Sequence, residues 1–531
     1  MDYSPNLVHF HNITGAKAVA DIIRTTLGPR AMLKMIIDNQ GGIIVTNDGY
    51  CVLREIETFH PAARSLIELS RMQDNEIGDG TTTVVLLSAE LLKTAEILLK
   101  KNFHPNQIIG GYYQALNDSI FFLEKILSVD LKKDNFEDML KIILTSICTK
   151  FVGHYSKLIC EIAFKAICKI NLKFETLQTK DFIKVEKITG GLIEDSKILS
   201  GILIAKDVSH PKMRRFILNP KILLLDCTID FKKGESKTSF EITDEYKWQN
   251  TLKVEENYTI YLCNIIKKFC PDVVVTEKNL SDLALHYLFK SNITVIRRVR
   301  KSDNNRLAKA TGSVIVSNIE DLEASDIGIA GCFAVKKIGE EYYTFITGCK
   351  NTSCTIVLFG SSKDILDEIE RNLYDAIGIA KSIIYKPRIS PGGGATEFAI
   401  SNYLREKSEL IRNDSYFIYN SIAAALEIIP KILIENCGVS ILNKISKLKD
   451  IHSKNGKFYG IEGKYGKICD MRKIGILEPT FMKSQIIKTA IENATMILRV
   501  DKVIYGLAQK NKNEIQKIKD ENTSKFSTLK N

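Results

Sequence analysis

The sequence has few of the features that mark secreted, zinc-binding or membrane proteins. Its 531 residues include one tryptophan, 8 dispersed histidines and 12 cysteines, and no two cysteines form a Cys-x-x-Cys pair. Neither a zinc framework nor a disulfide scaffold is therefore indicated, and we expect reduced, mostly buried thiols. We expect no uninterrupted apolar run to be long enough to cross a bilayer, and the first residues do not resemble a secretory signal. These absences predict a soluble, cytoplasmic chain with no membrane contact.

Several familiar catalytic signatures are missing as well. The chain contains no Gly-x-x-x-x-Gly-Lys-Ser/Thr sequence, which argues against a P-loop enzyme, and no kinase motif set or Ser-His-Asp order is evident. The net charge of +11 arises from 74 basic and 63 acidic residues, and residues 297–301 are its densest basic cluster. A nucleic-acid partner is the weaker interpretation of this charge. Most of the excess of basic residues is spread along the chain, as expected of a solvated surface, and the Lys-rich tail 510–531 contributes to it.

What the chain does contain is the composition of a large globular protein, with 45% hydrophobic and 26% charged residues. Its length predicts three or four domains with sizeable cores. Apolar residues at helical spacing predict a helix over 16–27 that ends at Gly28, and another over 82–100. Two short apolar runs, 32–38 and 42–46, predict a β-hairpin, and Asp48 is expected at its tip.

The middle of the chain has a different pattern. Buried strands are predicted at 221–226 and 273–275 together with a helix at 283–289, and this α/β pattern indicates a separate domain. The polar stretch 232–256 is too long for an ordinary loop and is expected to form a partly helical excursion. Beyond residue 358 helical patterns return. A domain built from both ends of the chain, with the middle inserted into it, is one economical explanation.

The most informative motif is Gly78-Asp79-Gly80-Thr81-Thr82-Thr83, which leads directly into the predicted helix over 82–100. Glycines let the backbone approach an anion, and the unpaired N–H groups at a helix start favour negative charge. Because Asp79 would repel a bare phosphate, the motif makes most sense with a cation such as Mg²⁺ between them. Taken alone, the same pattern is also typical of ordinary turn and helix-cap chemistry.

Two further segments are candidates for the same site. Residues 391–397, Pro-Gly-Gly-Gly-Ala-Thr-Glu, open onto a helix predicted over 398–410 and give a second glycine-rich approach to a helix start. Asp375 lies in a segment that would otherwise be assigned to a solvated helix face. Each of these segments is a weak signal by itself.

Six motifs together occur in the order and approximate spacing of group II chaperonins, the TCP-1/CCT family, which the chain resembles over almost its whole length. They are Thr26-Leu27-Gly28-Pro29-Arg30, Thr46-Asn47-Asp48-Gly49, Gly78-Asp79-Gly80-Thr81-Thr82-Thr83, Asp375-Ala376, Gly392-Gly393-Gly394 and Gly475-Ile476-Leu477-Glu478-Pro479. Three other stretches, 60–65, 292–305 and 370–376, most resemble one particular paralogue within the family.

The resemblance implies a multidomain α and β protein with the chaperonin fold. The expected mainly helical equatorial domain, which binds ATP, comprises residues 1–143 and 397–531. A small intermediate hinge domain would comprise 144–213 and 359–396. The expected α/β apical domain, which binds substrate proteins, spans 214–358 and carries a helical lid protrusion at about 232–262.

The resemblance also implies a site for ATP or ADP with Mg²⁺, and K⁺ as a further candidate ion. Asp48 and Asp375 match the carboxylates that orient the attacking water, and Asp79 matches the Mg²⁺ ligand. Lys150 matches a lysine that senses the γ-phosphate. The remaining implied nucleotide contacts are Gly28, Pro29, Gly80, Thr81, Thr82, Thr83, Thr149, Gly394, Gly463, Lys464, Glu478 and Lys483.

The leading hypothesis is an ATP-hydrolysing chaperone subunit. By the resemblance, its partners are paralogous subunits in a hetero-oligomeric double ring with eight subunits per ring, and its clients are non-native proteins such as actin and tubulin. Ionised aspartates can polarise a water, and the rest of phosphoryl transfer needs mainly positioning and charge neutralisation. The alternatives are a structural or client-binding subunit with little hydrolysis, and a nucleic-acid-binding protein.

Overall fold

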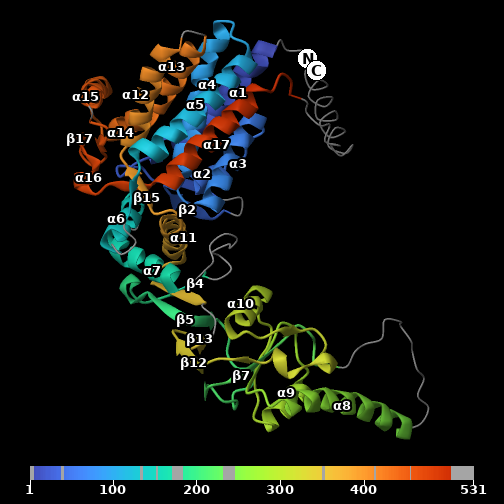
Figure 1. The fold of residues 1–531 in the computed structure, drawn as a ribbon. Helices are drawn as coiled ribbons and strands as arrows, with labels where there is room; N and C mark the ends of the chain where they lie inside the picture. The colour runs from blue at the N-terminus through green and yellow to red at the C-terminus, as the bar shows by residue number, and fades with distance from the viewer. Residues whose placement is uncertain are drawn as a thin grey trace, which may run out of the picture.

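The computed structural model describes residues 5–37, 41–131, 136–150, 153–169, 183–230, 245–349, 353–411, 414–454 and 456–503. These residues form an elongated molecule with a helical bundle at one end and an α/β body at the other (Figure 1). Further helices and a mixed sheet lie between the two ends. The tail 510–531 and the first part of the predicted protrusion, up to residue 244, lie outside the described residues.

The helical bundle has one hydrophobic core made from both ends of the chain. Its buried residues come from the segments 13–127 and 398–498. The central helix α4 (Thr81–Lys100) is buried on nearly all sides, and its own apolar side chains, such as Leu87 and Leu91, are fully or almost fully buried. The other helices are α1 (Pro5–Ile23), α2 (Gly49–Arg54), α3 (Pro61–Glu76), α5 (Pro105–Phe122), α12 (Ala395–Leu410), α13 (Ser415–Leu426), α14 (Ile428–Asn436), α15 (Ile441–Ser453), α16 (Met471–Ile474) and α17 (Thr480–Leu498).

The predicted hairpin near the N-terminus is confirmed. Strands β1 (Lys34–Ile37) and β2 (Ile43–Thr46) pair antiparallel. The position predicted for Asp48 is wrong, since it lies beyond the end of β2 rather than at the tip. There it caps the N-terminus of α2, and its carboxylate accepts a hydrogen bond from Cys51 N at 3.1 Å. Packing explains the difference, because a Cβ on Gly49 would lie 2.4 Å from Thr82 Oγ1 and the turn is therefore pressed against α4.

The middle region has a second core, formed by residues from the segments 131–185 and 354–383. Its helices are α6 (Phe136–Ile147), α7 (Ser156–Lys169) and α11 (Lys363–Tyr385). The adjoining six-stranded sheet has the order β4-β14-β5-β13-β12-β6. The strands are β4 (Ile183–Thr189), β5 (Lys197–Ile204), β6 (Phe216–Leu218), β12 (Cys332–Ile338), β13 (Glu341–Thr347) and β14 (Cys354–Gly360).

The α/β body at the far end confirms the pattern predicted for the middle of the chain. Four parallel strands, in the order β10-β7-β8-β9, form its sheet, and β11 pairs antiparallel with β7. The elements are β7 (Lys221–Leu225), α8 (Glu245–Lys268), β8 (Val273–Thr276), α9 (Asp282–Lys290), β9 (Thr294–Ile296), α10 (Lys301–Thr311), β10 (Ile315–Val316) and β11 (Gly328–Ile329). The described part of the polar excursion is the start of α8.

Two small sheets contribute residues to a cavity at the base of the bundle. Strands β3 (Val129–Asp130), β15 (Arg388–Pro391) and β18 (Leu477–Pro479) form a three-stranded sheet. A hairpin of β16 (Tyr459–Glu462) and β17 (Lys467–Asp470), which the sequence analysis missed, interrupts the helical pattern.

Two expectations drawn from composition need correction. All 12 cysteines are free, as predicted, but only five are buried, four are partly buried and three are exposed. Residues Ser415–Asn436 are long and apolar enough to cross a membrane by composition, contrary to the sequence analysis. In the structure 72% of the most apolar window of this segment is buried, as expected for a core helix of the bundle.

Candidate functional site

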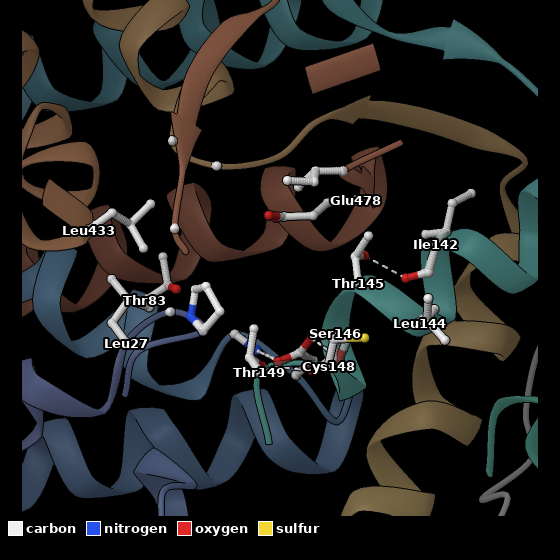
Figure 2. Close-up of a pocket in the computed structure, with 18 of the residues that line it drawn as sticks. Leu27, Thr83, Ile142, Leu144, Thr145, Ser146, Cys148, Thr149, Leu433 and Glu478 are labelled. Atoms are coloured by element: carbon white, nitrogen blue, oxygen red, sulfur yellow. Dashed lines mark hydrogen bonds between the residues drawn. The ribbon is translucent and has the colours of Figure 1, made fainter. Parts of the chain in front are cut away.

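Glycine-bearing turns and the C-terminal end of α6 surround a cavity of about 570 Å³ at the base of the helical bundle. Figure 2 shows Leu27 and Thr83 on one side of it, and Ile142, Thr145 and Ser146 of α6 on the other. Of the 16 predicted site residues, the lining includes Gly28, Pro29, Asp79, Gly80, Thr83, Thr149, Gly394, Gly463, Lys464, Glu478 and Lys483. The predicted site residues that do not line the cavity are Asp48, Thr81, Thr82, Lys150 and Asp375.

The first turn of α4 has the geometry expected of a phosphate-binding helix start. Gly80 has a positive φ of 80°, and a Cβ there would lie 2.5 Å from Ile486, so only glycine fits without displacement. Gly80 N donates to Asp79 Oδ1 at 2.7 Å. Thr81 and Thr82 follow in the first helical turn, where backbone N–H groups have no partner within the helix. These groups and the helix dipole favour an anion at this end of the cavity.

Two more glycine turns approach the cavity closely. Gly394 has a φ of 75° and is the N-cap residue of α12, and a Cβ there would lie 3.0 Å from Pro430. Gly28 has a φ of 91°, and a Cβ there would lie 2.7 Å from Leu433. Gly463 packs directly against Pro29. Backbone groups of three distant segments can therefore approach one ligand without obstruction by side chains.

Asp48, Lys150 and Asp375 lie together beside the glycine-flanked turn at the start of α4. Lys150 Nζ pairs with Asp375 Oδ2, and each side chain is only 10% exposed. Thr81 Oγ1 donates to Asp48 Oδ1 at 3.2 Å, which places Asp48 at the start of α4. A Cβ on Gly378 would lie 2.1 Å from Ile77 O, so α11 packs with its backbone against the 77–78 turn. This close packing places Asp375 next to Lys150, although the two residues are 225 positions apart in the sequence.

The electrostatics of this cluster are dominated by burial and by excess negative charge. Burial raises the pKa of Asp375 well above its ordinary value, and the Lys150 ammonium only partly opposes the rise. The carboxylates of Asp48 and Asp79 add to it. Burial alone would lower the pKa of Lys150, but the three surrounding carboxylates raise it instead. A lysine in this setting stays protonated and can bind a phosphate oxygen.

A second ion-pair cluster lies at the other side of the cavity. Lys483 Nζ contacts Glu397 Oε1 at 2.6 Å and Glu478 Oε2 at 2.5 Å. Burial raises the pKa of Glu478, and Lys483 opposes this rise. Glu478 is labelled at the cavity in Figure 2, where its carboxylate can accept hydrogen bonds from ligand hydroxyls.

A Mg²⁺ ion fits the donors that are present. Within the described ranges, no three His, Cys, Asp or Glu side chains are arranged to hold a metal by themselves. Mg²⁺ is commonly held by one or two carboxylates together with substrate phosphates. Asp79 lines the cavity between the α4 turn and α6, so it can provide that carboxylate.

Sequence reasoning missed several residues of the site. Ser146 donates to Asp79 Oδ2 at 2.7 Å, and Gln73 Nε2 donates to Asp79 O at 3.0 Å. Glu397 is the last residue of the glycine-rich segment 391–397, but that segment gave no prediction of a role for its carboxylate. Ser146 belongs to no motif, and its spacing of four residues before Lys150 is the only signal that could have suggested it. The basic cluster 297–301 comprises the turn after β9 and the first residue of α10, and it does not line this cavity.

Comparison with known proteins identifies the fold and the activity. A family model described as "TCP-1/cpn60 chaperonin family" matches residues 19–506. The chain is 47% identical to T-complex protein 1 subunit gamma of Schizosaccharomyces pombe, over 93% of this chain and 95% of that protein. It is 48% identical to T-complex protein 1 subunit gamma of Bos taurus and of Homo sapiens, over 94% of this chain and 92% of each relative. These matches confirm the resemblance, and the paralogue that the sequence most resembles is the gamma subunit.

The matches carry several consequences for the chain. Members of this family bind ATP and are ATPases, and the gamma relatives imply a cytosolic location and partner subunits in a hetero-oligomeric complex. The mixed α/β multidomain fold is that of the same family. The chain belongs to the TCP-1/cpn60 chaperonin family and is an ATP-dependent folding chaperone.

Proposed function

We propose that the cavity at the base of the helical bundle is the ATPase site, with Asp48 and Asp375 as the residues that orient the attacking water. The observation that carries this proposal is the convergence of Asp48, Lys150 and Asp375 beside a phosphate-binding helix start. The backbones at Gly28, Gly394 and residues 80–83 hold the phosphates. Glu478, Lys483, Gly463 and Lys464 lie on the side that receives the ribose and base, and Thr149 and Pro29 complete the walls.

The proposed chemistry requires little from the protein beyond positioning. A bound Mg²⁺ neutralises phosphate charge, and Asp79 holds it. Asp48 is oriented by Thr81 and by Cys51 N, so its carboxylate has a defined direction. Asp375 accepts a hydrogen bond from water and polarises it for in-line attack. Lys150 binds the γ-phosphate and stabilises the charge that develops on it.

Domain movement is the proposed link between hydrolysis and folding. The proposed equatorial domain comprises 1–143 and 397–531, the intermediate domain 144–213 and 359–396, and the apical domain 214–358. Three separate hydrophobic cores support the division into three domains. The proposed boundary at 143 falls inside α6, whose buried residues pack in the core of the middle region. Asp375 belongs to α11 in the middle region, while Asp48 and Asp79 belong to the bundle. Hydrolysis would therefore depend on how α11 packs on the bundle, and a lid protrusion at about 232–262 would respond to it.

The hairpin of β1 and β2 supports assembly with partner subunits. Among the residues that the structure describes, no further strand pairs with this two-stranded sheet, and Met35, Ile37 and Ile43 are 72%, 74% and 58% exposed. Such an edge is a template for pairing with another chain. We propose a double ring with eight subunits per ring, in which neighbouring paralogues cover this hairpin. Actin and tubulin are the proposed clients, and K⁺ is a proposed second ion beside Mg²⁺.

The direct test is nucleotide binding by the purified full-length chain. Titration with a fluorescent ATP analogue is expected to show Mg²⁺-dependent binding in the wild-type protein, and Asp79→Ala is expected to remove the Mg²⁺ dependence. Equal binding by both proteins at all Mg²⁺ concentrations would refute the metal role of Asp79. In the assembled particle, full nucleotide occupancy of this subunit without turnover would favour the structural alternative.

A further inference from the structure

The carboxylate of Asp79 is held by one hydrogen bond on each oxygen. Gly80 N donates to Oδ1 at 2.7 Å, and the hydroxyl of Ser146 donates to Oδ2 at 2.7 Å. The torsion of an aspartate carboxylate is broad, so a single hydrogen bond would leave the group free to turn. Two donors on different elements, one on the α4 turn and one on α6, define the carboxylate plane.

The position of Ser146 does not depend on Asp79, because its neighbours anchor the end of α6. Thr145 Oγ1 donates to Leu477 O at 2.9 Å, which joins α6 to β18. Asn47 Nδ2 donates to Thr149 O at 2.9 Å, which joins the turn after α6 to the end of β2. The Ser146 hydroxyl is thus presented to the cavity by a helix that is held on both sides (Figure 2).

Resting on the proposed metal role of Asp79, we propose that Ser146 is a positioning residue for the Mg²⁺ site. Its hydroxyl holds Asp79 Oδ2 in place, so that the other lone pairs of the carboxylate face the cavity when Mg²⁺-nucleotide enters. Groups that hydrogen-bond a metal ligand commonly change metal affinity by about 10-fold to 100-fold when they are removed. Ser146 comes from a different segment than Asp79, so the metal site also depends on the packing of α6 against the bundle.

The test measures Mg²⁺ affinity rather than turnover. A fluorescent, non-hydrolysable ATP analogue is titrated into the purified full-length chain at a series of MgCl₂ concentrations and, separately, in EDTA. Ser146→Ala is expected to raise the Mg²⁺ concentration for half-maximal binding by about tenfold. Affinity for the analogue in EDTA is expected to stay at the wild-type value. Ser146→Thr keeps the hydroxyl and is expected to restore the wild-type Mg²⁺ dependence.

Two controls separate this role from a general loss of structure. Ser119→Ala removes a buried hydroxyl that donates to Ala115 O within α5, and it should leave both measurements unchanged. Ser146→Cys, a near-isosteric and weak donor, is expected to behave like Ser146→Ala and decides the question if the alanine variant does not fold.

Each result has a distinct meaning. An unchanged Mg²⁺ dependence in Ser146→Ala, or an equal loss of affinity with and without Mg²⁺, overturns the positioning role. Such a result leaves the proposed function standing if Asp79→Ala still abolishes the Mg²⁺ dependence. If the wild-type protein binds the analogue without any Mg²⁺ dependence, the metal role of Asp79 itself fails.

Discussion

Replacing Asp375 by asparagine tests whether α11 supplies part of the hydrolytic machinery. The change keeps the volume of a side chain that is 10% exposed and leaves Lys150 a carbonyl oxygen to bind, but it removes the negative charge. Breaking a buried ion pair commonly costs about 3–5 kcal/mol. We expect a smaller loss of stability here, because the Asp48 and Asp79 carboxylates still compensate the Lys150 charge.

The expected effect on catalysis is much larger than that on binding. General-base assistance contributes roughly 10² to 10⁴ in rate, so hydrolysis at this subunit should fall by at least about 100-fold, equivalent to about 2.7 kcal/mol of barrier. Nucleotide affinity should stay the same or rise, since Lys150 no longer has an ionised partner that competes with the γ-phosphate.

The assay must report on this subunit alone within the assembled complex. An azido-ATP labelled at the α- or the γ-phosphate can be cross-linked to the chain after timed incubation. Wild-type protein should lose the γ-label and keep the α-label, whereas Asp375→Asn should keep both. Asp367→Asn, on the same helix and paired with Lys187, is the matched control and should behave as wild type. Loss of the γ-label from Asp375→Asn at the wild-type rate would refute the assignment.

The pH dependence of hydrolysis should reflect the raised pKa of Asp375, because protonation of its carboxylate removes the acceptor for water. Single-turnover rates should therefore fall on acidification at a higher pH than for an ordinary aspartate. The Asp375→Asn variant should lack this acidic decrease in rate. Burial lowers the pKa of His452, whose Nε2 lies 2.8 Å from Tyr459 O. The unfolded state therefore binds the proton more readily, and thermal stability should fall as pH drops through about 6.5, with a weaker dependence in His452→Gln; equal profiles would contradict this. Leu91→Ala in α4 removes a fully buried side chain and should cost about 2–5 kcal/mol, seen by calorimetry as a lower bundle transition temperature. Ile37→Asp in the exposed hairpin should leave the chain folded but reduce its recovery in the full particle by size-exclusion chromatography, and undiminished assembly would exclude the hairpin as a subunit contact.

Local signals explain what could be predicted from the sequence. The helix start after Gly80 and the turn before α12 depend on residues next to each other in the chain, and both were predicted correctly. Asp48 was misplaced because the sequences Asn39-Gln40-Gly41 and Asn47-Asp48-Gly49 have similar compositions, each typical of a turn. Packing of Gly49 against Thr82 distinguishes them, and nothing in the local sequence reports that contact.

Contacts between distant segments could not be predicted from spacing. That Lys150 and Asp375 belong to one site was implied only by family resemblance, because a carboxylate on an amphipathic helix has no local mark of burial, and their direct pairing was not predicted. Ser146 and Glu397 were not assigned roles for the same reason. Each acts through a partner on another segment, Asp79 and Lys483 respectively.

The charge balance of the cluster suggests the order of events in the site. Three carboxylates, Asp48, Asp79 and Asp375, face a single ammonium on Lys150, so a divalent cation would bring the group to neutrality. On the proposed assignment, the γ-phosphate of an entering Mg²⁺-ATP would compete with Asp375 for that ammonium. If Lys150 turned to the phosphate, the Asp375 carboxylate would lose its partner and become available to water. Binding of the nucleotide would thereby activate the residue that hydrolyses it, and only while α11 remains packed against the 77–78 turn.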